Sequence, residues 1–255
     1  EGVEMLDGMS GAISFDKVDF FYKENEWVLK GLSFKIDAGK LLALVGSTGA
    51  GKTSIISVLN RFYEIQNGTI AIDGVNIEDI KLDNLRKNIA LVQQEVFLFS
   101  DSILNNITLF DAEITRDIVL NSAKEIGVHE FINSLPNNYN YIVGERGVTL
   151  SAGQRQLIAF LRVYVRNPKI LILDEATSSI DTATEEILQN ALNKLSKNRT
   201  TIVIAHRLST IVNADKILHL EDGRVLEEGT HKQLIEDRGS YADMYSLQAD
   251  EDLNA

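Results

Sequence analysis

The chain has 255 residues, of which 44% are hydrophobic and 24% are charged, and its formal net charge is -12. This is the composition of an ordinary folded globular protein, and the scattered basic residues argue against a surface that binds nucleic acid or an acidic membrane. Cysteine is absent and the four histidines are dispersed, which excludes disulfides and thiolate metal sites. No apolar run reaches the roughly 18 residues that a membrane-spanning helix needs.

The first part of the chain predicts an antiparallel lobe. Apolar residues alternate over 13–22 and 32–36, as in half-buried strands, and residues 70–77 predict a hairpin that turns at Asp73-Gly74. Between them, LLALV at 41–45 is continuously apolar, which is typical of a strand covered on both faces, and a helix is expected from about residue 52 to 62. The opening segment, residues 1–12, lacks an initiator methionine and a signal pattern, so we expect a piece of a longer polypeptide.

The later part predicts helices and more buried strands. Residues from about 95 to 165 are expected to form an inserted helical lobe, with one helix in ITRDIVLNSAKEIG closed by Gly127. The apolar runs at 170–173 and 201–205, separated by a helical stretch, predict parallel strands. A hairpin around Asp222-Gly223, one helix over about 231–247 and a frayed acidic tail at 248–255 complete the expected α/β fold, a mixed parallel sheet with an antiparallel lobe and a helical lobe.

A phosphate-binding loop is predicted between the buried strand at 41–45 and the helix after it. GSTGAGKT fits the pattern G-x-x-x-x-G-K-[ST], in which glycines let backbone N–H groups surround a phosphate. The lysine adds a charge for the β- and γ-phosphates and the threonine a hydroxyl for Mg²⁺. The alternative is a glycine-rich turn with an exposed lysine. The expected nucleotide contacts are Gly46, Ser47, Thr48, Gly49, Ala50, Gly51, Lys52, Thr53 and Ser54. The expected class is therefore a P-loop NTPase.

Polar side chains follow other predicted strands. Asp174 and Glu175 end the run ILILDE, where one carboxylate can face Mg²⁺ and the other an attacking water. His206 follows the strand at 201–205, and Gln94 follows another apolar stretch. A histidine or glutamine in such a place is more often structural, so these two residues carry little weight alone.

A second anion-binding loop is predicted at VTLSAGQRQL, residues 148–157. Ser151, Ala152, Gly153 and Gln154 are small or polar and precede a helix, whose first N–H groups favour an anion. Because the phosphate loop already provides one site, the phosphate for this second loop needs another source.

Taken in order, these motifs resemble the nucleotide-binding domain of an ATP-binding cassette (ABC) transporter over about residues 13–247. The resemblance joins Tyr22, the phosphate loop, Gln94, the signature LSAGQ, ILILDE, the SSID segment and His206. It implies ATP and Mg²⁺ as ligands, with Tyr22 stacked on adenine and with Mg²⁺ held by Thr53, Gln94 and Asp174. It also implies catalysis by the residues Glu175, His206, Lys52 and Gln94.

The resemblance answers the question of the second phosphate. In the family, two such domains pack head to tail, so Ser151, Gly153 and Gln154 would contact ATP held by a second nucleotide-binding domain, the same chain or a paralogue. The segment GERG at 144–147 and TIVIAHRLSTI are similar to exporters of the multidrug and lipid type. That branch implies a preceding transmembrane domain with coupling helices, and a place at the cytoplasmic face of the membrane without insertion by this segment.

Two departures from the family pattern stand out. Ala152 replaces the usual glycine of the signature, which raises the question of a degenerate half-site, and SSID replaces SALD, a mild change. A chromosome-maintenance ATPase would need a long coiled coil after residue 53, and a tandem translation factor would repeat the motifs. Neither feature is seen. A soluble ABC-type ATPase or a nucleotide-sensing module not coupled to transport stays open as an alternative.

Overall fold

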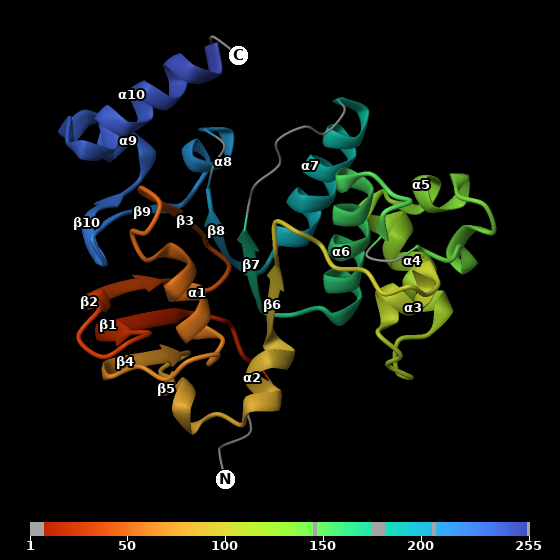
Figure 1. The fold of residues 1–255 in the computed structure, drawn as a ribbon, viewed down its shortest axis with the longest axis horizontal. Helices are drawn as coiled ribbons and strands as arrows, with labels where there is room; N and C mark the ends of the chain where they lie inside the picture. The colour runs from red at the N-terminus through yellow and green to blue at the C-terminus, as the bar shows by residue number, and fades with distance from the viewer. Residues whose placement is uncertain (1–7, 145–146, 175–181, 206–207, 254–255) are drawn as a thin grey trace. The chain divides into compact units, whose positions relative to one another are not determined.

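A computed structural model describes residues 8–144, 147–174, 182–205 and 208–253. The described residues form two compact units (Figure 1), the first within 1–89, 169–175 and 198–255, and the second within 90–168 and 176–197. The second unit is thus made of two insertions into the first. Strand β6 (Ile89–Val92) begins where the chain passes from the first unit to the second.

An antiparallel sheet in the first unit has the strand order β2-β1-β4-β5. Alternation in β1 places Phe15 in the core, where its ring stacks on that of Phe34 of β2 with centroids 4.5 Å apart. The predicted hairpin at Asp73-Gly74 is confirmed, but the second strand starts at Trp27, earlier than expected. The bounds are β1 Ile13–Phe21, β2 Trp27–Ile36, β4 Asn67–Ile72 and β5 Val75–Asn76.

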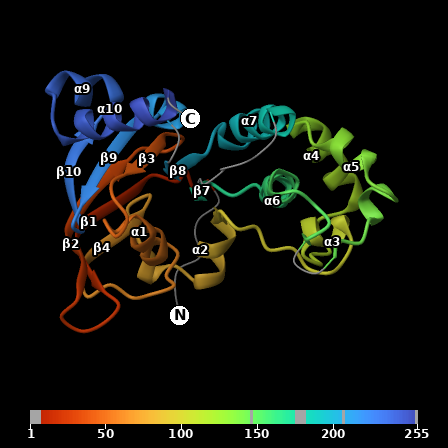
Figure 2. The same cartoon turned by 45° about the horizontal axis from the view of Figure 1, so that its top comes forward.

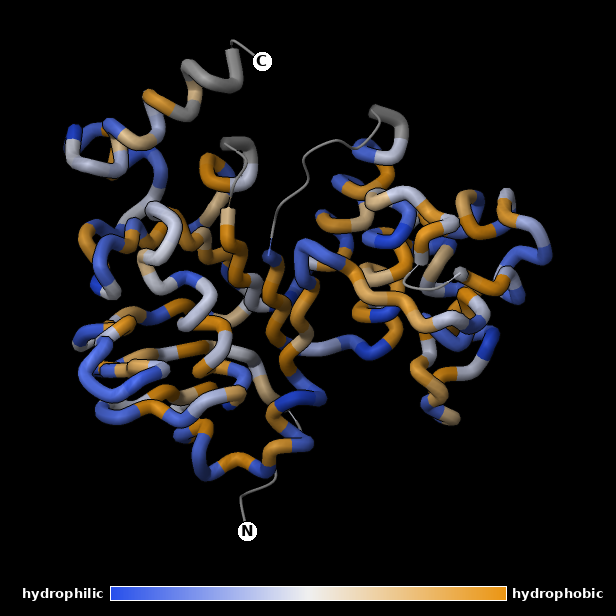
Figure 3. The backbone as a smooth tube through the Cα atoms, in the orientation of Figure 1, coloured by the Kyte–Doolittle hydropathy of each residue, from blue (hydrophilic) through white to orange (hydrophobic). Residues whose placement is uncertain are grey.

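A second sheet in the first unit has the order β10-β9-β3-β8-β7. The predicted parallel pairing is confirmed, because β3 lies parallel to β8 and β9, and β7 lies parallel to β8. These parallel strands are almost wholly buried, and β7 and β8 appear orange in Figure 3. The bounds are β3 Leu41–Val45, β7 Ile170–Asp174, β8 Thr200–Ile204, β9 Lys216–Glu221 and β10 Arg224–Gly229.

The helices of the first unit include α1 (Lys52–Leu59) and α2 (Leu82–Asn88), a 3-10 turn η1 (Ile77–Asp79), and α8 (Leu208–Val212). The single helix expected over 231–247 was wrong. It is divided into α9 (His231–Asp237), which packs on β10 (Figure 2), and α10 (Ser240–Leu253). Arg238 adopts a left-handed conformation (φ 53°), and a Cβ on Gly239 would fall on the carboxylate of Glu227, so the chain must turn there. The helix also continues into the tail that was expected to fray.

The second unit is helical around α6 (Ala152–Arg166), which packs on α3, α4 and α7. Helix α4 ends at Gly127 (φ 87°), as predicted from the glycine. The other bounds are α3 Ile103–Thr108, α4 Arg116–Ile126, α5 His129–Ser134, η2 Asn138–Asn140 and α7 Thr182–Ser196. The α/β fold with an antiparallel sheet and a helical lobe is confirmed. Among the described residues, no helix is both long and apolar enough to cross a membrane.

Candidate nucleotide-binding site

The predicted phosphate loop connects β3 to α1, and two of its glycines are required by the space around them. Gly46 has φ 139°, and a Cβ there would fall on the carbonyl oxygen of Leu220. Gly51 has φ 104°, and a Cβ there would come within 2.9 Å of Leu29 Cδ2. Larger residues cannot take either position without strain, so the sequence pattern follows from the packing of the loop.

The loop presents positive charge and backbone donors. Helix α1 has no side-chain cap at Gly51, so its first N–H groups are available to an anion. Lys52 Nζ donates to the carbonyl oxygens of Gly46 (2.6 Å) and Ser47 (2.8 Å), which holds the ammonium group at the loop. Burial lowers the pKa of Lys52, and the negative charge of Asp174 opposes that shift. A phosphate would add further negative charge beside this half-buried lysine and so favour its charged form.

The turn between β9 and β10 is hydrogen-bonded to the phosphate loop and braces it. Gly223 N–H donates to the carbonyl of Ala50 (3.2 Å), and the carbonyl of Gly223 accepts from Lys30 N–H (3.0 Å). Lys30 Nζ also pairs with Asp222 Oδ1 at 2.6 Å. A Cβ on Gly223 would fall on the carbonyl of Val28, so the turn fits between the loop and β2 only as glycine. The sequence indicated a hairpin here but gave no sign of this contact.

The carboxylate predicted to bind metal ends a buried strand. Asp174 is the last residue of β7 and lies opposite Ile204 of β8. Its charge acts on Lys52, so both residues belong to one electrostatic environment. Thr53, exposed in the first turn of α1, offers the second oxygen. This oxygen donor set fits Mg²⁺. Glu175, His206, the SSID residues and, in GERG, Glu145 and Arg146 lie outside the described residues.

An exposed aromatic ring lies at the end of β1. Tyr22 directly follows this strand and is 48% exposed, so it is not the core tyrosine that was the alternative. Its hydroxyl lies 3.1 Å from Ser54 Oγ, and Ser54 is buried on α1. The ring is therefore linked directly to the helix that follows the phosphate loop, where a nucleobase can stack on it.

The signature loop belongs to the second unit. Ser151 caps α6 in a capping box: its Oγ accepts from Gln154 N–H (3.2 Å), and Gln154 Oε1 accepts from Ser151 N–H (3.0 Å). Ser151 and Ala152 are exposed, whereas Gly153 is buried. The Ser151 hydroxyl still has its own hydrogen to donate. The side-chain oxygen of Gln154, predicted to contact nucleotide, is used within the cap.

Gln94 is exposed in the loop after β6, also in the second unit. That loop is tied to α6, because Arg162 donates to the carbonyls of Asn106 (2.8 Å) and Phe97 (3.3 Å). Burial, with a contribution from Arg166, lowers the pKa of Arg162 to about 10. The structure therefore brings Tyr22, the phosphate loop and Asp174 together in one unit, and it joins the Gln94 loop to the signature helix in the other.

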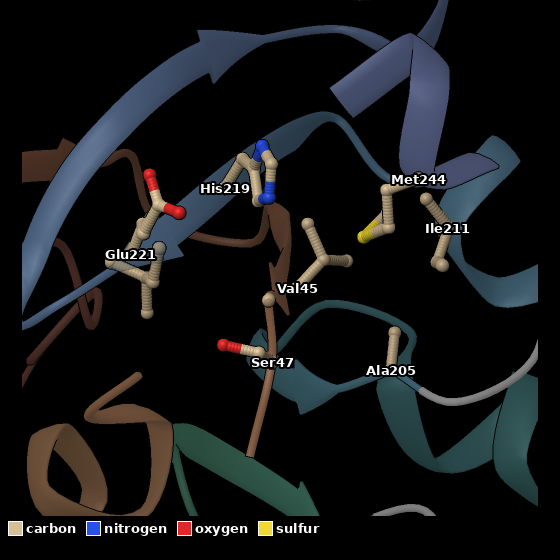
Figure 4. Close-up of a pocket in the computed structure, with 9 residues that line it drawn as sticks. Val45, Ser47, Ala205, Ile211, His219, Glu221 and Met244 are labelled. Carbon is tan, nitrogen blue, oxygen red and sulfur yellow. The ribbon is translucent and has the colours of Figure 1, made fainter. Parts of the chain in front are cut away.

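A cavity of about 340 Å³ borders the start of the phosphate loop (Figure 4). It shares only Gly46 and Ser47 with the loop, so it is not the phosphate cradle itself. Met244 of α10 and His219 of β9 close other sides. The C-terminal helix thus lines the same cavity as the start of the loop. The lining residues are Val45, Gly46, Ser47, Ala205, Ile211, His219, Leu220, Glu221 and Met244.

The two sheets, the glycine loop and the half-buried lysine define a nucleotide-binding domain of the P-loop class. Within that class, a family profile described as ABC transporter matches residues 29–178. The chain is 48% identical over 250 residues to an ATP-dependent lipid A-core flippase of Idiomarina loihiensis, covering 97% of this chain and 43% of that protein. The corresponding flippase of Haemophilus influenzae is 47% identical, with 97% and 42% covered.

The chain is also similar to a solved structure of a bacterial Atm1-family ABC exporter with ATP bound, at a TM-score of 0.90 and 40% identity, over 98% of this chain and 43% of that one. This chain therefore belongs to the ABC transporter family, as an ATP-binding ATPase domain of the exporter type. It spans less than half of the length of the relatives it matches.

Proposed function

We propose that the chain is the motor domain of an ABC exporter. Two copies, or this chain and a paralogue, pack head to tail around two Mg-ATP. ATP closes this dimer, hydrolysis allows it to open, and the cycle drives export of a substrate across the membrane. The observation that carries the proposal is the exposed Ser151, whose hydroxyl accepts a hydrogen bond in the cap of α6 and can still donate one to a phosphate held by a partner.

The residues have separate tasks in this proposal. Lys52 and the first N–H groups of α1 bind the β- and γ-phosphates. Thr53, Asp174 and Gln94 would hold Mg²⁺, which neutralises phosphate charge when bound. Glu175 orients and deprotonates the attacking water, and His206 contacts the γ-phosphate. Ser151, Gly153 and Gln154 complete the site of the other copy.

The second unit supports contact with a membrane domain. Phe97 and Phe99 are 54% and 47% exposed, and their rings meet edge to face with centroids 5.1 Å apart. They follow Gln94, so an apolar partner at this surface would contact the Gln94 loop, which we expect to contribute to Mg²⁺ binding. We assign this surface to coupling helices of a transmembrane domain, which places the chain at the cytoplasmic face of the membrane. Residues 1–12 would be the linker from that domain and 13–247 the nucleotide-binding domain, with its helical lobe at about 95–165. Residues 248–255 would be an acidic tail.

A mixing experiment tests the shared site. Lys52→Met removes the phosphate-binding charge, and Ser151→Ala removes the donor, so each variant alone should hydrolyse little ATP. In a mixed dimer, the loop of the Ser151→Ala chain meets the intact Ser151 of the Lys52→Met chain and forms one complete site. Phosphate release should therefore return on mixing. If each chain uses its own Ser151, mixing restores nothing.

A second variant tests the catalytic assignment. Glu175→Gln should keep ATP binding and lower turnover by about 10²- to 10⁴-fold, the value of general-base catalysis. Turnover near that of the parent chain contradicts the role of Glu175. The alternative is a nucleotide-sensing module or a soluble ATPase that is not coupled to a membrane domain. The test compares phosphate release by the 255-residue chain alone with phosphate release by the full-length transporter. The alternative predicts that the membrane domain changes nothing.

A further inference from the structure

A second exposed tyrosine lies against Tyr22. The ring of Tyr63, which follows α1, has its centroid 4.9 Å from that of Tyr22 at an interplanar angle of 89°. The buried ring of Phe20 meets Tyr22 at 4.7 Å and 81°. Tyr22 therefore has one buried and one exposed aromatic neighbour, both nearly perpendicular to its own ring, which is the favoured edge-to-face geometry.

These contacts fix the Tyr22 side chain before any ligand arrives. A tyrosine ring is placed by two side-chain torsions. Contacts with Phe20 and Tyr63 restrain the ring, and the hydrogen bond to Ser54 (3.1 Å) restrains its far end. Ser54 is 5% exposed and belongs to α1, so the hydroxyl is anchored to a rigid element.

Burial alone does not account for Tyr63. It is 51% exposed, so about half of the residue's surface remains in solvent and contributes nothing to a core. Phe62, the residue before it, is equally exposed at 51% but lies against Arg86, whose guanidinium carbon is 5.5 Å from the Phe62 ring centroid. Two neighbouring aromatic residues of equal exposure thus have different partners, and only the second is part of the Tyr22 cluster of Phe20, Tyr22 and Tyr63.

We propose that Tyr63 is a positioning residue for the nucleobase of ATP. It holds the Tyr22 ring in the orientation that stacks on the base, so binding does not have to order that side chain. This inference rests on the proposed role of Tyr22. Tyr63 acts through Tyr22, and its effect is confined to ligands that carry a base.

The test compares a ligand with a base and one without. Binding of Mg-ATP and of Mg-tripolyphosphate is measured by calorimetry for the 255-residue chain and for Tyr63→Leu, Tyr63→Phe and Phe62→Leu. Tyr63→Leu should weaken ATP by about two- to tenfold, the value of one aromatic pair, and leave tripolyphosphate unchanged. Tyr63→Phe keeps the ring and should retain ATP affinity, as should Phe62→Leu.

Each contrary result has a defined meaning. Equal weakening of ATP and tripolyphosphate by Tyr63→Leu would mean a general structural role and overturn the proposal, even if that variant is less stable. Unchanged ATP affinity in Tyr63→Leu overturns it as well. Tyr22→Leu distinguishes failure of the Tyr63 role from failure of the Tyr22 role. If it weakens ATP while Tyr63→Leu does not, only the role of Tyr63 fails, and if it has no effect, the assignment of Tyr22 fails too.

Discussion

Lys52 Nζ lies 2.6 Å from the carbonyl oxygen of Gly46, so the lysine of the phosphate loop is hydrogen-bonded to the first residue of the same loop. The ammonium group is thus already held at the loop, so the lysine side chain loses little conformational freedom on binding phosphate. The price of this placement is partial burial of a charge, which lowers the pKa of Lys52.

Replacing this lysine should separate binding from folding. Lys52→Met removes the charge but keeps an unbranched side chain, so Mg-ATP affinity should fall by about a hundredfold or more, since charge-assisted bonds to several phosphate oxygens are lost. The melting temperature should hardly change. Lys232→Met is the control, because Lys232 is exposed and lies 3.9 Å from Glu236 in a long surface ion pair. A large fall in melting temperature for Lys52→Met alone would show that the lysine mainly holds the loop together.

Two capping boxes among the described residues offer a matched pair. Ser151 caps α6 and Thr230 caps α9 with the same two backbone bonds, and the Thr230 hydroxyl also donates to Gln233 Oε1 (3.0 Å). Alanine at either position should cost about 1 kcal/mol of stability through the lost cap. Only Ser151→Ala should also lower ATP turnover in the assembled transporter. Similar turnover for both variants would reduce Ser151 to a helix cap.

Alanine substitution in the two Asp-Gly turns at Gly74 and Gly223 can distinguish the cost of a steric clash from the cost of backbone strain. Gly223 and Gly74 both have positive φ, at 74° and 82°, but a Cβ on Gly74 meets no atom within 4 Å, whereas one on Gly223 falls on Val28. Gly74→Ala should cost about 1 kcal/mol of unfolding free energy, from strain alone. Gly223→Ala should cost about 2 to 4 kcal/mol and should weaken ATP binding through Ala50. Chemical denaturation measures the unfolding free energy, and calorimetry measures ATP affinity. Equal costs for the two variants would contradict the supporting contact of Gly223 with the phosphate loop.

The contacts of Asp73 with residues 10–12 should make folding stability depend on pH. Its carboxylate accepts N–H groups from Ser10 (2.8 Å), Gly11 (3.0 Å) and Ala12 (2.9 Å). Burial opposes the shift, but these bonds lower the pKa of Asp73 below 3.8. A carboxyl with a lowered folded pKa stabilises the fold above its unfolded pKa, and this stability is lost as pH falls through the folded value.

Asp73→Asn should therefore cost about 1 kcal/mol at neutral pH, a small figure because the carboxylate is largely solvated. The difference from the parent chain should shrink as pH falls below 3.8. Urea denaturation at neutral pH and at a pH below 3.8 measures this difference in stability. Hydrogen exchange of the Gly11 and Ala12 amides reports locally on their bonds to Asp73. A difference that does not depend on pH would contradict the charged form of Asp73.

Local patterns predicted much of this structure. Continuous apolar runs identified β3, β7 and β8 as buried parallel strands, and glycine with lysine and threonine identified the phosphate loop, because these features depend on near neighbours in sequence. The resemblance to a family supplied the roles of Ser151 and Tyr22. Tyr63 was missed, although the adjacent aromatic residues Phe62 and Tyr63 at the end of the predicted helix were a visible signal.

What could not be predicted depends on contacts between distant segments. The break between α9 and α10 follows from Glu227 beside Gly239, and the packing of Gly223 against Ala50 joins residues far apart in the chain. A sequence pattern records that a turn exists. It does not record what the turn touches.

That distant contact has a consequence for synthesis. The phosphate loop is complete in sequence by Thr53, but the backbone carbonyl of Ala50 finds its partner only at Gly223. A nascent chain released or stalled before that turn leaves the ribosome would carry every loop residue and still lack the brace. Nucleotide capture should then begin late in translation, once the C-terminal hairpin has folded against the loop.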